Sequence, residues 1–107
     1  MRILALHPWG LSAQLFERQM APLVTLLGSM HEIVYIDGPN EGRKATSVPD
    51  FVQRPFFNWH EGMLSPSVEK AQAFIYEIIE DEGPFDGVLG LSQGAALAMS
   101  MLLHPEI

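Results

Sequence analysis

The sequence alternates short apolar segments with longer segments of helical periodicity, and this alternation constrains the fold more than any other feature. Apolar, β-branched and aromatic residues concentrate at positions 3–6, 31–37 and 85–91, in runs too short for a stable helix. The segments between and after these runs carry apolar residues three or four positions apart, as amphipathic helices do. Strands that alternate with helices predict an α/β fold with a mainly parallel sheet and right-handed crossovers.

The helix boundaries are marked by capping and breaking residues. We expect Ser12 to cap a first helix that Gly28 ends, with Pro22 kinking or splitting it. A second helix is predicted over 66–82, with Ser65 as its N-cap, and a third begins near Gln93. The apolar face of the first helix is predicted as Phe16, Met20, Leu23, Val24 and Leu27, and that of the second as Val68, Ala71, Phe74, Ile75, Ile78 and Ile79.

Length and composition limit the domain count and the kinds of partner. A chain of 107 residues allows one domain, taken as 1–107, and a hydrophobic content of 48% predicts a packed core. Without cysteine the chain has no disulfides, thiolate metal sites or cysteine nucleophile, and we expect no metal or other cofactor. The net charge of −7 argues against nucleic acid. The longest nearly apolar run, 95–103, is too short to cross a membrane, so we expect a cytoplasmic protein.

A segment of 29 residues, 38–66, lies between the second predicted strand and the second predicted helix. Connections of this length are usually lids, binding loops or disordered segments, and the aromatic content here argues against disorder. We interpret the segment as a lid or a substrate-shaping loop. Its aromatic side chains Phe56, Phe57 and Trp59 suggest an apolar substrate, although a loop that packs its own aromatic residues would look the same.

The pentapeptide Gly90-Leu91-Ser92-Gln93-Gly94 fits the pattern G-x-S-x-G of a nucleophile elbow. A predicted buried strand precedes it and a predicted helix rich in small residues follows, as the mechanics of such a turn require. Ser92 is therefore the candidate nucleophile, and the backbone N–H of Gln93 can donate to a developing oxyanion. A glycine-rich turn with a capping serine is the simpler alternative, and the glycine spacing excludes a dinucleotide-binding fingerprint.

A second oxyanion donor is expected in the loop after the first predicted strand. There His7-Pro8-Trp9-Gly10 offers the backbone N–H of Trp9, because proline has none. We expect His7 to pack or hydrogen-bond beneath this loop and not to act as the base.

The chain resembles the fungal family of serine hydrolases within the α/β-hydrolases, chiefly through residues 2–7, 16–19, 34–39 and 83–96. The resemblance covers the front part of such a domain. It implies a partial α/β-hydrolase fold, a three-layer α-β-α arrangement that stops after the nucleophile helix. It also implies esterase or thioesterase activity on acyl substrates, including thioesters bound to carrier proteins in secondary metabolism. The family's nucleophile falls on Ser92, and its oxyanion amides fall on Gln93 and Trp9.

Hydrolases of this kind take their acid and then their histidine from positions after the nucleophile. The 15 residues after Ser92 hold only His104 and Glu106, in the reverse order. His104 follows Ser92 by twelve residues, about 18 Å along a helix, and His60 would reach Ser92 only if the long segment folds over the elbow. Three hypotheses stay open: a truncated hydrolase, a noncatalytic acyl-binding or scaffolding protein, and an enzyme completed by a partner.

The last predicted helix is apolar on nearly every side, and the strand before the elbow is expected at or near a sheet edge. Both features predict that the isolated chain associates with itself or aggregates.

Overall fold

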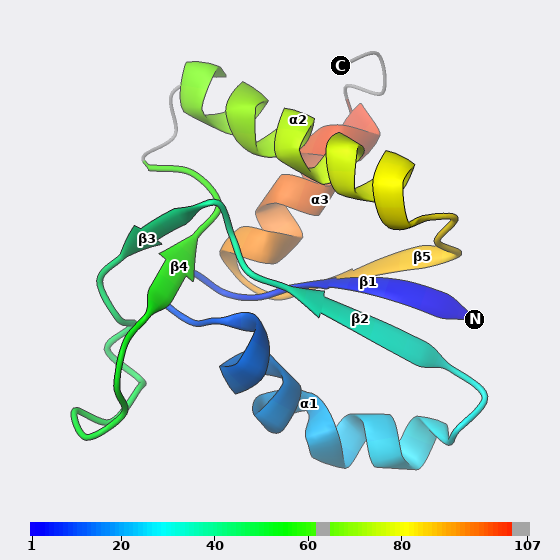
Figure 1. Ribbon diagram of the computed structural model, residues 1–107, viewed down its shortest axis with the longest axis horizontal. Helices are drawn as coiled ribbons and strands as arrows, with labels where there is room; N and C mark the ends of the chain where they lie inside the picture. Colours follow the sequence, from blue (N-terminus) through cyan, green and yellow to red (C-terminus); the bar gives the residue numbers. More distant parts are fainter. Residues whose placement is uncertain (62–64, 104–107) are drawn as a thin grey trace.

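The computed structural model describes residues 1–61 and 65–103 and shows an α/β arrangement (Figure 1). The predicted N-cap side chain of Ser65, together with His104 and Glu106, lies outside the described part. The elements are, in chain order, β1 (Arg2–Leu6), α1 (Ala13–Leu27), β2 (Glu32–Ile36), β3 (Asn40–Gly42), β4 (Phe56–Asn58), α2 (Ser65–Glu82), β5 (Gly87–Gly90) and α3 (Gln93–Leu103).

The main sheet is parallel and has the strand order β2-β1-β5. Leu4, Ala5 and Leu6 of the central strand β1 are fully buried, because helices cover both faces. Figure 1 shows α1 on one face of the sheet and α2 and α3 on the other. This arrangement confirms the predicted α/β class and its three layers. It also leaves β5 at an edge of the described sheet, as predicted.

Helix α1 begins and ends where the capping residues predict. Ser12 has an extended backbone and its side-chain oxygen accepts a hydrogen bond from the N–H of Leu15 at 3.2 Å. Gly28 ends the helix with a φ of 86°, and its N–H donates to the carbonyl of Val24. The helix runs through Pro22 without being split. Of the predicted apolar face only Phe16 is buried, and the C-terminal leucines of the helix are exposed.

Helix α2 packs with the apolar face that its sequence predicts. Ala71 and Ile75 are fully buried in the main core with Leu4, Leu6, Trp59 and Leu97, and the other predicted positions are half-buried. The side chain of Gln72 crosses to α3, where its Nε2 donates to Ser100 Oγ at 2.9 Å.

The segment 38–66 is more structured than its sequence predicts. Strands β3 and β4 form a small antiparallel sheet beyond the carboxyl ends of β1 and β2 (Figure 1). A backbone bridge between Phe57 and Leu11 ties this sheet to the loop after β1. Strands of three residues are too short to produce a readable alternation, so the sequence pattern misses them.

Helix α3 and the edge of β5 leave apolar surface uncovered in the described part of the chain. A groove of about 580 Å³ runs along α2, β5 and α3. Its apolar lining includes Ile75, Ile79, Val88, Met99 and Leu102. Within the described residues, no helix is long and apolar enough to cross a membrane. The cytoplasmic location suggested by the sequence stays a prediction.

Candidate active site

Ser92 occupies the turn between β5 and α3, where the nucleophile elbow was predicted. Its φ of 56° is the only positive value among the described residues other than glycine. A left-handed backbone costs an L-residue energy and is typical of functional turns. Ser92 is exposed, so its hydroxyl is accessible from solvent. These features match a serine presented for attack.

The two glycines of the pentapeptide allow the backbones around Ser92 to approach closely. A Cβ on Gly90 would come within 2.7 Å of the backbone nitrogen of Ala95, and one on Gly94 would collide with the carbonyl oxygen of Leu6. The first turn of α3 therefore packs directly on the end of β1. Only glycine permits both contacts, which explains the residue choice on each side of the serine.

The two predicted oxyanion donors follow the carboxyl ends of the neighbouring parallel strands β1 and β5. Leu6 of β1 pairs with Gly90 of β5, and Trp9 and Gln93 each come three residues after these paired positions. Among the described residues, neither backbone N–H donates to a protein acceptor. Both N–H groups thus remain available for a ligand.

The loop that carries the Trp9 amide is held in place by β4. Gly10 donates its N–H to the carbonyl of Phe57 at 2.9 Å, and Phe57 returns a bond to the carbonyl of Leu11 at 2.7 Å. Gly10 has a φ of 77° and touches Ala45, whose N–H donates to the Gly10 carbonyl. The segment 38–66 therefore shapes this loop directly.

His7 is buried beneath the loop, as predicted. Its Nε2 lies 2.9 Å from the N–H of Gly38 and accepts that bond, so its Nδ1 carries the proton and donates to the carbonyl of Pro8 at 2.7 Å. Burial lowers the pKa of His7, although the bond to Pro8 and the charge of Asp37 oppose the shift. Because both nitrogens of the neutral His7 ring are hydrogen-bonded to the backbone, this side chain has a structural role.

The predicted substrate-contacting aromatic residues lie in different environments. Phe56 is buried in a small core cluster with Leu11 and Val48. Phe57 is half-buried and lines a cavity of about 280 Å³ beside the start of α1. Trp59 belongs to the main core, and its ring packs at 4.9 Å from that of His7. Substrate contact by these three residues stays a prediction.

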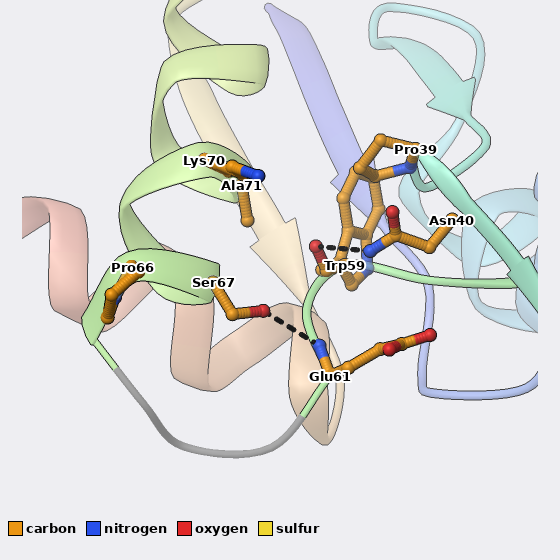
Figure 2. A pocket seen from close by; sticks show the side chains of 8 residues that line it. All are labelled: Pro39, Asn40, Trp59, Glu61, Pro66, Ser67, Lys70 and Ala71. Carbon is orange, nitrogen blue, oxygen red and sulfur yellow. Dashed lines mark hydrogen bonds between the residues drawn. The ribbon is translucent and has the colours of Figure 1, made fainter.

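Trp59 also lines a cavity of about 430 Å³ between α2 and the residues that follow β2 and β4 (Figure 2). Figure 2 shows Trp59 and Pro39 on one wall and Ser67, Lys70 and Ala71 of α2 on the other. Ser67 Oγ accepts the N–H of Glu61 at 2.9 Å, which joins the two walls. The cavity combines an aromatic surface with charged and polar groups.

A general base for Ser92 is not evident within residues 1–61 and 65–103, where no histidine ring is hydrogen-bonded to its hydroxyl. His60 is buried, and its backbone carbonyl accepts a hydrogen bond from the side chain of Gln93. The described part also contains no group of three residues able to hold a metal ion.

The side chain of Gln93 takes part in the site in a way that the G-x-S-x-G pattern does not predict, because that pattern concerns only the backbone of this residue. A polar side chain directly after an elbow serine, facing a long connection, was the available signal.

Comparison with known proteins agrees with the geometry of the elbow. Residues 1–106 match the serine hydrolase (FSH1) family. The chain belongs to this family. The resemblance noted in the sequence is thereby confirmed, and the parallel sheet with its helices agrees with a partial α/β-hydrolase fold.

Relatives of the chain within curated proteins carry hydrolase and esterase names. The chain is 35% identical to esterase alnB of Emericella nidulans over 106 residues, which are 99% of this chain and 37% of the relative. It is 32% identical to hydrolase FUB4 of Fusarium oxysporum f. sp. lycopersici, covering 99% of this chain and 42% of the relative. Esterase FPY3 of Fusarium mangiferae is 35% identical, with 95% and 48% covered. The chain thus spans less than half the length of these relatives.

Proposed function

We propose that the protein hydrolyses carboxylic esters or thioesters through Ser92. The observation that carries this proposal is the strained, exposed backbone of Ser92 at the start of α3, with a free N–H on the next residue. The esterase names of the relatives support the same class of reaction.

In this mechanism Ser92 Oγ attacks the carbonyl carbon of the acyl group while its proton passes to a general base. The N–H groups of Gln93 and Trp9 donate to the resulting oxyanion. Collapse of the tetrahedral intermediate breaks the bond to the alcohol or thiol, which leaves with the proton. Water then attacks the acyl-serine by the same route, which releases the acid and restores Ser92.

In this mechanism the general base and its acid are groups outside the described residues. Losing triad members costs a serine hydrolase several orders of magnitude in rate. A noncatalytic acyl-binding role is the second candidate, favoured by the absence of a histidine bonded to Ser92 in residues 1–61 and 65–103. A base supplied by a partner protein would account both for the strained, exposed Ser92 and for the lack of a histidine bonded to it in the described residues.

The proposed substrates are small acyl esters and acyl thioesters on a carrier protein, as the family resemblance implies for secondary metabolism. The cavity lined by Trp59 is the proposed place for part of the substrate, because it joins an aromatic wall to polar groups and Trp59 is bonded to Gln93 of the elbow. Its Lys70 and Glu61 favour a polar leaving group over a long acyl chain.

Hydrolysis of p-nitrophenyl esters and of acyl thioesters by the purified chain tests the proposal. We expect a rate above background that Ser92→Ala abolishes and that Ser47→Ala, at an exposed loop serine, leaves unchanged. Equal rates for the wild type and Ser92→Ala would overturn the proposal. A folded wild-type chain without hydrolysis would favour the acyl-binding alternative.

A further inference from the structure

The carboxamide of Gln93 makes a paired contact with the backbone that follows β4. Its Oε1 accepts the N–H of Trp59 at 2.9 Å, and its Nε2 donates to the carbonyl of His60 at 2.9 Å. A primary amide can accept and donate at once, so it matches a backbone N–H and C=O pair in a way that an apolar or acidic side chain cannot. The elbow is therefore fastened to the segment 38–66 by the residue directly after its serine.

Trp59 continues this connection to the loop after β1. Its indole Nε1 donates to the carbonyl of His7 at 2.8 Å, and the two rings pack against each other. His7 in turn bonds the carbonyl of Pro8, the residue before Trp9. Every group along this path from Gln93 to Pro8 is buried or half-buried, which shields the bonds from competing water.

We propose that the Gln93 side chain is a positioning group that fixes the backbone N–H of Trp9 relative to the elbow. This inference rests on the proposed hydrolase function. The backbone of Gln93 supplies one oxyanion donor, and its side chain sets the place of the other through Trp59 and His7. The two donors follow different strands, and the second loop is held by β4 through the bonds of Gly10 and Leu11 with Phe57. The carboxamide fastens the residues directly after β4 to the elbow, so β4 and the loop bonded to it keep a fixed place relative to Ser92.

The test uses the rate at which a fluorophosphonate modifies Ser92, because the phosphoryl oxygen of this probe occupies the oxyanion position. Gln93→Met keeps the size of the side chain and the backbone N–H but removes both hydrogen bonds. Gln93→Glu keeps the acceptor for the Trp59 N–H and places a second oxygen against the His60 carbonyl. Gln19→Met, at an exposed position of α1, is the matched control.

We expect Gln93→Met to lower the maximal rate of modification by about 10- to 100-fold, as misplacing one oxyanion donor does. The concentration giving half-maximal rate should change less than about threefold, since positioning acts on the reacting geometry more than on binding. Gln93→Glu should fall between Gln93→Met and the wild type, and Gln19→Met should match the wild type. Hydrogen exchange of the Trp59 backbone amide should accelerate in Gln93→Met and change less in Gln93→Glu.

The outcomes separate this inference from the function on which it rests. If the wild type shows no modification of Ser92, the hydrolase proposal is overturned and the positioning role with it. If the wild type reacts and Gln93→Met reacts equally fast, only the positioning role is overturned. The positioning role is also overturned if folded Gln93→Met reacts more slowly while hydrogen exchange of the Trp59 amide stays unchanged.

Discussion

Ser92 combines a strained backbone with an exposed hydroxyl, and the two properties have the same cause. The turn from β5 into α3 is tight enough to require a left-handed residue, with glycines on either side where the chain touches Leu6 and Ala95. Glycine would fit the serine's place with less strain. The serine is therefore retained at an energetic cost that stability alone does not explain.

Replacing Ser92 by glycine should accordingly stabilise the fold while removing the nucleophile. We expect Ser92→Gly to raise the free energy of unfolding by about 1 kcal/mol, after allowance for the larger entropy of glycine in the unfolded chain. Ser92→Ala keeps the left-handed strain and should change stability little. Urea denaturation of the three proteins measures this, and a Ser92→Gly variant no more stable than Ser92→Ala would contradict the strain argument.

His7 should make the stability of the fold depend on pH. Burial lowers its pKa from the ordinary value of 6.5, so the unfolded chain takes up the proton first as the pH falls. The contribution of neutral His7 is fully present above pH 6.5 and is lost as the pH falls toward the lowered pKa of the folded state. Protonation would also place a hydrogen on Nε2 against the Gly38 N–H.

The variant His7→Gln isolates this effect, because its side chain does not titrate. Between pH 7.5 and 5.5 the free energy of unfolding should fall more steeply for the wild type than for His7→Gln, as measured by urea denaturation across the series. If the free energy of unfolding fell equally with pH in both proteins, protonation of His7 would not be the cause of the pH dependence.

At the scale of elements, the sequence pattern predicts the parts whose local chemistry determines their structure. Ser12 and Gly28 fix the ends of α1, and the spacing of apolar residues fixes the buried face of α2. The G-x-S-x-G pattern predicts the turn that carries Ser92. The sheet of β3 and β4 depends instead on long-range pairing with Leu11 and Gly10, which no local pattern encodes. The contact between Gln93 and Trp59 is also long-range, and its one local signal is a polar side chain directly after the elbow serine.

Pro22 is an unfavourable residue for the interior of a helix, yet it lies within α1. It lies on the exposed side of α1, and the helix continues through it although proline removes a hydrogen bond to the carbonyl four residues earlier. We expect Pro22→Ala to raise the free energy of unfolding by about 1–3 kcal/mol, the cost of proline inside a helix less its entropic benefit. Thermal unfolding followed by circular dichroism measures this, and an unchanged or lower midpoint would count against the prediction.

At the scale of the whole molecule, the described fold presents a sheet edge and an apolar groove side by side. Val88 on β5 is 47% exposed, and Leu102 on α3 is 75% exposed. Unpaired strand edges next to apolar surface favour pairing between copies.

We therefore expect the purified 107-residue chain to form oligomers or aggregates at micromolar concentration. Val88→Lys places a charge on the edge strand and should shift the chain toward monomer, whereas Phe51→Lys, at an exposed side chain in the loop before β4, should not. Light scattering coupled to size-exclusion chromatography distinguishes these forms. A monodisperse wild-type monomer that unfolds cooperatively would contradict the expectation.

The claim that Ser92 is an activated nucleophile is tested most directly by mapping a fluorophosphonate adduct on the folded chain by mass spectrometry. We expect one phosphonylated peptide, modified at Ser92, that disappears in Ser92→Ala and is retained in Ser47→Ala. A folded chain with no adduct, or with an adduct on another serine that survives Ser92→Ala, would contradict it.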